Sequence, residues 1–543
     1  KATRLSAARR LVDRMARSAW TITKRMEELD AAGEGLLIYD VEAESHPVSF
    51  VVWSAAPSSN VDRLGRFYEY EYDFYGAIFS GRVSQERARS EAARMRGRVW
   101  AGRTDNECLG WTVANRSNRF FNHVVESLCS GRQPDFATLA SGGGYIVRNA
   151  GWYGNGRHGS RSWLSLPLDS PFAEPYFLDL LALYLWRTAG ADVADAAARK
   201  RNAAAVSLSS EVRRYLGIGN SSGIGMVAAL VRWPTWLATF CSMREVVRAY
   251  VITRPRTDPA TLDRFCRLMA RAADYYDMQP AQDVTEVEQP ARIASGLRSV
   301  LAGVQRYWEK LLATEFPWAE VARRATEQGS LEVDEQATSL LMEVAPDFAD
   351  AVAALMRKGM ATSRSVEPAM TCGELRAILE TRFRWALDID FDAPGAAEHF
   401  WYKSEENGEN RRGERKIDPG VENETFVNVA GAAQQLAEAL EAADRTEAVG
   451  MFLLRHPGLS HIAARVQLAR RMPYSELRAN IIARDFLPMD GIRFLLGMFG
   501  LEASAPYSTR WVRGVFFQGA PLASALEVGL EDDWMFPTTV PWN

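Results

Sequence analysis

Cysteine, histidine and lysine are all scarce in this chain of 543 residues. There are five cysteines and six histidines, and only seven of the 64 basic residues are lysines. The cysteines are widely spaced and none lies in a Cys-x-x-Cys pair, which argues against both a disulfide framework and a zinc knuckle. We therefore expect a reducing, cytoplasmic location.

The few histidines and lysines give no sign of a metal or of Schiff-base chemistry. The sequence contains no His-Glu-x-x-His motif, and His456 and His461 are five residues apart. That spacing does not place two ligands on the same face of a helix. Scarce lysine also disfavours a pyridoxal enzyme. The sequence thus signals no metal and no cofactor.

Long apolar runs and an excess of charge are missing as well. The most apolar stretch, Tyr176–Trp186, carries Asp179 and falls short of the roughly 20 residues that a membrane span needs. The formal net charge is -4, so the chain has no overall attraction for nucleic acid or an acidic membrane. We expect a soluble protein with neither of these partners.

What the chain does contain is arginine, alanine and an ordinary share of apolar residues. Hydrophobic residues make up 47% and charged residues 24%, which is typical of folded domains. Abundant arginine and alanine indicate a GC-rich, bacterial type of gene. Some of the arginines can also clamp a carboxylate or a phosphate through two hydrogen bonds.

Apolar spacing predicts helices over most of the sequence. Leu5–Leu29 has the pattern of one amphipathic helix, and Tyr176–Thr188 that of a buried helix that Gly190 ends. Leu36–Val41 and Val48–Ser54 are rich in Ile, Val, Tyr and Trp, which favours a hairpin. The sequence therefore predicts a mainly helical fold with a small N-terminal β-hairpin and minor β elements.

Local signals mark several helix starts. Ser84 can cap a helix over 85–96, Asp258 followed by Pro259 is typical of an N-cap, and Thr371 with Glu374 forms a capping-box pattern. The alternating aromatic and acidic residues of Tyr68–Tyr75 fit a helix and a strand about equally.

The length suggests more than one lobe. The acidic, proline-bounded segment Met278–Pro290 is the best linker. We predict an N-terminal lobe over 1–285 that carries two glycine-rich stretches. A C-terminal helical lobe over 286–543 would follow, with a polar insertion at 388–420.

The first candidate site is the glycine-rich stretch Gly217–Met226. It lacks the Gly-Lys-Ser/Thr of a P-loop, and its glycine spacing differs from the dinucleotide fingerprint. We interpret it as a loop that presents backbone N–H groups at a helix N-terminus, where anions bind. The alternative is a plain helix–helix turn. The residues predicted to bind the ligand are Gly219, Asn220, Ser221, Ser222 and Gly223.

The second candidate is the stretch from Arg148 to Trp163, which combines arginines, a histidine and aromatic residues with four glycines. Guanidinium groups can clamp an anion, aromatic rings can stack on a planar substrate, and histidine transfers protons near neutral pH. The alternative is a solvated hairpin or Ω-loop. The predicted binding residues are Arg148, Trp152, Arg157 and Arg161, and the predicted catalytic residues are Tyr153 and His158. We expect this stretch to share one cleft with the first.

The third candidate lies between His399 and Arg415, where aromatic residues adjoin charges of both signs. Glu405 and Glu406 can supply a general base, and Lys403 and Arg412 can bind the substrate. The aromatic residues suggest the anchor of a lid. A solvated charged loop is the alternative.

Together these stretches predict an enzyme that uses general acid–base chemistry on a small anionic molecule bearing a carboxylate or phosphate, with an aromatic group as a further option. A lyase or a hydrolase fits best because no cofactor motif is present. Two alternatives remain: a flavin- or nucleotide-dependent oxidoreductase, and a non-catalytic helical binding or scaffold protein. The sequence also leaves a homo-oligomer open.

Overall fold

The computed structural model describes most of the chain, with gaps. The described residues are 3–55, 73–95, 107–114, 119–149, 170–174, 176–223, 234–279, 290–327, 330–349, 351–352, 354, 366–390, 392–394, 401–403, 410–412, 429–471, 497–504, 511–528 and 534–537.

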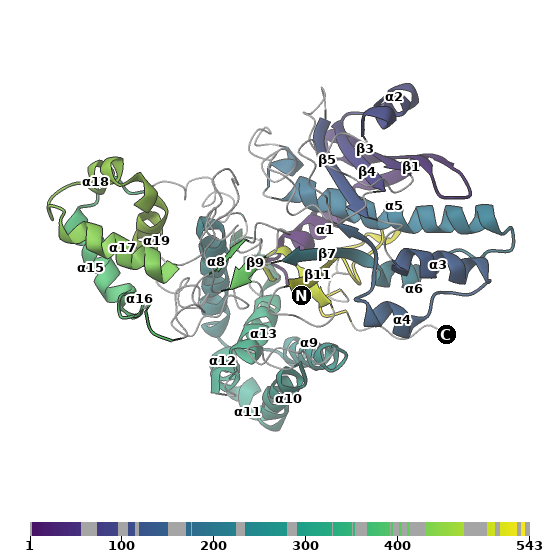
Figure 1. Ribbon diagram of the computed structural model, residues 1–543. Helices are drawn as coiled ribbons and strands as arrows, with labels where there is room; N and C mark the ends of the chain where they lie inside the picture. The colour runs from purple at the N-terminus through teal and green to yellow at the C-terminus, as the bar shows by residue number, and fades with distance from the viewer. Residues whose placement is uncertain are drawn as a thin grey trace.

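The centre of the protein is a nine-stranded sheet built from both ends of the chain (Figure 1). Its spatial order is β1-β2-β3-β4-β5-β6-β7-β11-β10, and every described pair is antiparallel except β6 with β7. The strands are β1 (Thr21–Leu29), β2 (Gly35–Ala43), β3 (His46–Ser54), β4 (Phe74–Ser80), β5 (Glu107–Ala114), β6 (Tyr145–Asn149), β7 (Gly217–Gly223), β10 (Leu501–Ser504) and β11 (Trp511–Phe516).

This sheet shows that the predicted fold class is wrong. The predicted hairpin is present as β2 and β3, which pair from Gly35 with Ser54 to Ala43 with His46. It is not a small isolated element, however, because β4 and β5 extend it on one side and β1 on the other. The protein therefore has an α+β fold organised around a large sheet, and helices cover both faces of that sheet.

The middle strands are apolar because both of their faces are buried. In β3, Phe50 and Val52 face the larger core, whereas Val51 and Trp53 face a smaller core on the other side of the sheet. Side chains alternate between the two faces of a strand. Burial of both faces turns the alternating pattern of a surface strand into a continuous apolar run.

One long helix covers the larger face. Helix α5 (Phe177–Arg201) is buried over most of its length, and Figure 1 shows it lying along the sheet. Trp186, at its centre, stacks on Phe74 and meets Phe50 edge to face. Helix α2 (Gln85–Met95) covers the smaller core on the opposite face, where the Trp53 indole donates to the Ala88 carbonyl.

The predicted end of this helix at Gly190 is wrong. Helix α5 continues through Gly190 to Arg201. A Cβ at residue 190 would lie 3.0 Å from Val147 Cγ1 and 3.1 Å from Ile146 Cγ2. The glycine therefore allows the helix to lie close to β6, and it does not act as a helix terminator.

The predicted N-terminal helix is too long. Helix α1 (Ala7–Arg17) ends at the Ser18 cap, and residues 21–29 form the edge strand β1. The exposed charges of β1 and the register shift between Lys24 and Met26 are features that protect a sheet edge from pairing with other chains.

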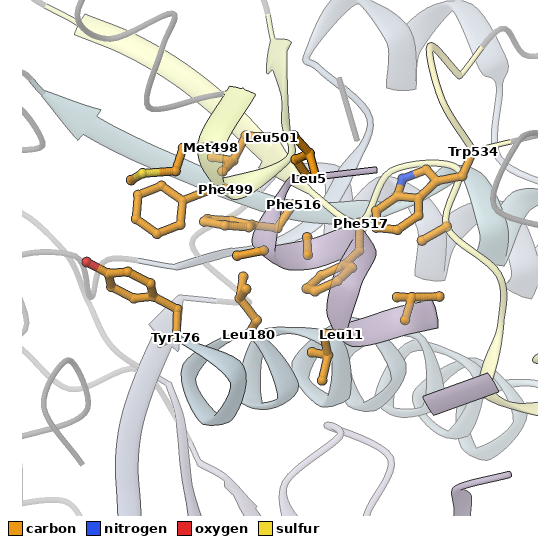
Figure 2. Packing of buried hydrophobic residues seen from close by; sticks show 14 of the residues in the cluster. Leu5, Leu11, Tyr176, Leu180, Met498, Phe499, Leu501, Phe516, Phe517 and Trp534 are labelled. Atoms are coloured by element: carbon orange, nitrogen blue, oxygen red, sulfur yellow. The ribbon is translucent and has the colours of Figure 1, made fainter. Parts of the chain in front are cut away.

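Figure 2 shows that the two ends of the chain pack together. Leu5 and Leu11, at the N-terminal end, share a core with Leu180 of α5 and with Phe516 and Phe517, at the end of β11. Residues from both ends of the chain therefore complete one core.

The other helices form two groups. Helices α8 (Pro234–Ile252), α9 (Pro259–Asp277), α10 (Pro290–Arg306), α11 (Trp308–Ala313), α12 (Pro317–Glu327) and α13 (Leu331–Leu341) pack together, and α15 (Cys372–Arg382), α16 (Arg384–Leu387), α17 (Val429–Glu441), α18 (Val449–Arg455) and α19 (Ser460–Arg471) form a second group at the left of Figure 1. The remaining short helices are α3 (Arg119–Cys129), α4 (Phe136–Ser141) and α6 (Ser210–Tyr215). In the described part of the chain, no helix combines the length and the apolar character that crossing a membrane requires.

The predicted helix starts are confirmed at three places. The Ser84 hydroxyl accepts from the N–H of Arg87, and Asp258 Oδ1 accepts from the N–H of Thr261 at 2.8 Å. Thr371 and Glu374 form the full capping box. The boundary at residues 285 and 286 remains a prediction, although α9 and α10 pack against each other across it.

Candidate functional site

The first two predicted stretches meet in the sheet. Strands β6 and β7 run parallel, with Arg148 opposite Gly219 and Asn149 opposite Asn220. Among the described strands this is the only parallel pair. Parallel neighbours end at the same edge of a sheet, so the chain leaves both strands at one edge.

The interpretation of residues 217–223 as a loop before a helix is wrong. These residues form β7, between β6 and β11, and the next described helix, α8, begins at Pro234. The helix N-terminus that was expected to attract an anion is therefore not formed by Gly219–Gly223. What remains of the prediction is the polar character of Asn220, Ser221 and Ser222 at the end of a strand.

Close packing explains the first two glycines of this strand. A Cβ on Gly219 would lie 2.6 Å from Cγ of Tyr145, whose ring therefore covers this position. A Cβ on Gly217 would lie 2.6 Å from the carbonyl oxygen of Phe516 and would clash with Val515. Both glycines make room for neighbouring strands and their side chains.

A buried arginine fixes the beginning of β7. Arg187 of α5 donates from Nε to the carbonyl of Leu216 at 2.9 Å, and from Nη2 to those of Arg214 at 3.1 Å and Ala520 at 2.8 Å. Burial lowers the pKa of Arg187 to about 10, so the guanidinium remains charged at neutral pH. One side chain thus joins the start of β7 and the segment after β11 to the central helix.

The Gly144–Tyr215 contact closes the opposite end of the β6–β7 pair. Gly144 has a φ of +67°, and a Cβ there would lie 2.8 Å from Cζ of Tyr215. Burial raises the pKa of the Tyr215 hydroxyl well above its usual range. The Gln518 amide donates to the carbonyl of Gly143 at 3.4 Å. This end of the pair is packed with protein groups.

Replacing Gly219 with alanine should destabilise the protein by about 1–3 kcal/mol, the usual cost of overpacking. Glycine-to-alanine changes inside a strand otherwise stabilise by roughly 0.5–1 kcal/mol, so the sign of the change identifies the clash with Tyr145. Urea unfolding of Gly219→Ala, of Tyr145→Ala and of the double variant measures the coupling between the two residues. An equal cost of Gly219→Ala with and without the tyrosine ring would contradict the packing explanation.

Most residues of the second stretch lie outside the described residues. These are Trp152, Tyr153, Arg157, His158 and Arg161. Arg148 is described as part of β6, at the position opposite Gly219. The shared cleft therefore stays a prediction.

The third stretch forms a separate short hairpin. Strand β8 (Trp401–Lys403) pairs with β9 (Asn410–Arg412), with Lys403 opposite Asn410 and Arg412 opposite Trp401. Glu405 and Glu406 lie outside the described residues. The hairpin is a sheet of its own, so the described pairing does not join Lys403 and Arg412 to the β6–β7 edge.

The structure also reveals a buried charge cluster that the sequence analysis did not single out. Asp192 of α5 accepts hydrogen bonds from the Tyr39 hydroxyl at 2.9 Å and from Arg213 Nη1 at 2.8 Å, and its other contact is with Lys24 at 3.2 Å. Arg213 also pairs with Asp195. The only sequence signal was two aspartates, three residues apart, in an alanine-rich part of the helix.

This cluster has the character of a structural network. Burial and the Asp192 carboxylate raise the pKa of Tyr39 well above 10, so the tyrosine stays protonated and donates to Asp192. Both carboxylates have cationic partners within the protein, as buried charges require. We therefore assign it no ligand. Within the described ranges, no three His, Cys, Asp or Glu side chains gather closely enough to hold a metal ion.

Comparison of the chain with protein families, with curated proteins and with solved structures found no match.

Proposed function

We propose that the protein is an enzyme that binds a small carboxylate- or phosphate-bearing molecule at the carboxyl edge of β6 and β7. The observation that carries the proposal is the register of the parallel pair, which places Arg148 beside Gly219 and Asn149 beside Asn220. In sheets with parallel strands and a crossover helix, ligands favour the edge where the strands end. The arginine-rich stretch follows β6 directly, so it starts at this edge.

In this proposal Arg157 and Arg161 hold the anionic group, together with the polar residues at the end of β7. His158 transfers the proton, and Tyr153 assists it. Glu405 and Glu406 belong to a lid or act as the base. The reaction is that of a lyase or a hydrolase, with a protonation step near neutral pH.

A non-catalytic scaffold is the second candidate, because the packing of the glycines in β7 needs no ligand to explain it. Gly217 and Gly219 are required by their neighbours whether or not a ligand binds. The glycine content of β7 therefore adds nothing to the argument for an enzyme, and the proposal depends on the residues at the edge.

A thermal-shift panel of inorganic phosphate, sulfate, acetate and benzoate tests the binding site. We expect an anion to raise the melting temperature of the natural protein, because a ligand that binds only the folded state stabilises it. Arg157→Ala with Arg161→Ala should abolish most of that rise.

The matched control is Arg267→Ala with Arg384→Ala, which removes the same charge from exposed positions and should leave the anion response unchanged. An equal response in both double variants would refute the anion site. Absorbance near 450 nm in the purified protein would instead indicate a flavin.

We also propose that the protein works in a reducing compartment such as the cytoplasm. Cys129, Cys266 and Cys372 are free thiols, and burial raises the pKa of Cys266 to about 11. Such a thiol is protonated and unreactive at neutral pH.

A further inference from the structure

We propose that the exposed face of helix α18 binds a second copy of this chain across a two-fold axis beside Met451. This inference is independent of the proposed anion site, because α18 belongs to the second helix group. Figure 1 shows α18 at the outer end of that group, well away from the central sheet, so the sheet does not obstruct a second copy at this helix. The evidence is an apolar patch and the spacing of the charges beside it.

An apolar patch covers the outer face of α18. Phe452 is fully buried, whereas Met451 is 57% exposed and Leu454 is 76% exposed. Residues three apart are neighbours on one face of a helix, so the two exposed side chains lie side by side. Pro368, which is also exposed, adjoins this surface, because its carbonyl accepts from the N–H of Gly450 at 2.9 Å.

The other large apolar side chains that are exposed in the described part of the chain form no such patch. None of them lies within one helical turn of another in the sequence, and the Arg324 guanidinium covers one of them, the ring of Tyr307, at 4.2 Å. Single apolar residues are normal on a protein surface, whereas a contiguous patch marks an interaction site. These scattered residues are Val246, Met278, Tyr307, Phe316 and Val528.

An ion pair borders the patch on α18. Arg455 donates from Nη1 and Nη2 to the two carboxylate oxygens of Glu447, at 2.5 and 2.6 Å. The hydrogen bond from Arg455 lowers the pKa of Glu447, so both groups are charged at neutral pH. Glu447 is four residues before Met451 and Arg455 is four residues after it. The face therefore has an apolar centre with one charge of each sign at equal spacing.

This spacing makes the face complementary to itself. When two copies of α18 pack antiparallel about an axis at Met451, each residue before Met451 lies opposite the residue equally far after it. Glu447 of one copy then lies opposite Arg455 of the second copy, and the two ion pairs meet as four charges of alternating sign. Leu454 lies opposite Ala448, whose small side chain leaves room for it. A two-fold dimer requires such a self-complementary surface.

The patch is small, so the dimer should be weak, with a dissociation constant on the order of 10–100 μM. Sedimentation velocity of the full chain, at concentrations from well below to well above this value, should show the mass rising from that of a monomer towards that of a dimer. Leu454→Ser should raise the dissociation constant at least tenfold. The matched control Val528→Ser, at a residue that is 63% exposed outside the patch, should stay within twofold of the natural protein.

Charge reversal tests the two-fold arrangement directly. Arg455→Glu and Glu447→Arg should each abolish self-association, because like charges then face each other across the axis. An equimolar mixture of these two variants should associate again, since the two like charges of one variant face two opposite charges of the other. The ion pair within one copy cannot produce such a recovery.

Each contrary result has a definite meaning. A natural protein that stays monomeric at all these concentrations would overturn the inference. Self-association that Leu454→Ser leaves unchanged would overturn it as well, because the interface would lie elsewhere. Reversal variants that stay monomeric when mixed would refute the two-fold arrangement. If circular dichroism shows that the reversal variants do not fold, Leu454→Ser, at a largely exposed position, decides alone.

Discussion

Replacing Glu343 with glutamine should lower the free energy of unfolding by about 3–5 kcal/mol, the usual cost of removing one partner from a buried ion pair. Glu343 lies in a short 3-10 helix, η5 (Met342–Val344), and is 1% exposed. Its carboxylate accepts from Arg9 Nη1 at 2.7 Å and from the backbone N–H of Arg4 at 2.9 Å. The glutamine would leave the Arg9 charge buried without this carboxylate.

The Glu343 cluster joins distant parts of the chain. Arg264 of α9 donates to the Glu343 carbonyl at 2.6 Å, so α1 and the central helices are held at one point. Urea unfolding measures the loss in free energy of unfolding. The comparison requires that the dependence of this free energy on urea concentration is the same in the variant and the natural protein. The control Glu327→Gln removes an exposed partner of Arg323 and should cost less than about 1 kcal/mol. Similar losses in the two variants would contradict the buried-pair argument.

Replacing Trp186 with alanine should cost about 3–5 kcal/mol, as expected for a large buried aromatic residue. Trp186 is fully buried, with its ring 5.8 Å from that of Phe74 and 5.2 Å from that of Phe50. Gly76 of β4 makes room for it, since a Cβ there would lie 2.5 Å from Cζ2 of Trp186. The cavity left by alanine would lie between α5 and the central sheet. Neither element can easily move to fill it, so most of the cost of the cavity should remain.

Thermal or urea unfolding of Trp186→Ala, compared with Phe316→Ala, tests this prediction. Phe316 is 42% exposed, so its truncation removes little buried area and should cost far less. A loss below about 1 kcal/mol for Trp186→Ala would mean that the α5–sheet core is loosely packed.

The local predictions succeeded where the signal lay within a few residues. Ser84, Asp258 and the Thr371–Glu374 pair each cap a helix with their own side chains. The hairpin of β2 and β3 was predictable because its two apolar strands are adjacent in the sequence.

The predictions failed where distant residues decide the structure. Gly190 has the appearance of a helix end, but Ile146 and Val147 of β6 make a glycine necessary in mid-helix. Residues 217–223 have the composition of a loop, yet β6 and β11, more than 70 and 280 residues away in the sequence, supply the hydrogen bonds that make them a strand.

The candidate site was predictable in part. Arg148 and the polar residues of β7 were chosen from composition, and the parallel register brings their strands together.

The sequence by itself determined the helix caps and the N-terminal hairpin, because side chains within a few residues control these features. The tertiary structure alone decided the nine-stranded sheet, the role of Gly217 and Gly219 in β7 and the parallel pairing of β6 with β7. Strand pairing and the space left for a glycine depend on residues far away in the chain, and local composition does not record which of those residues will become neighbours.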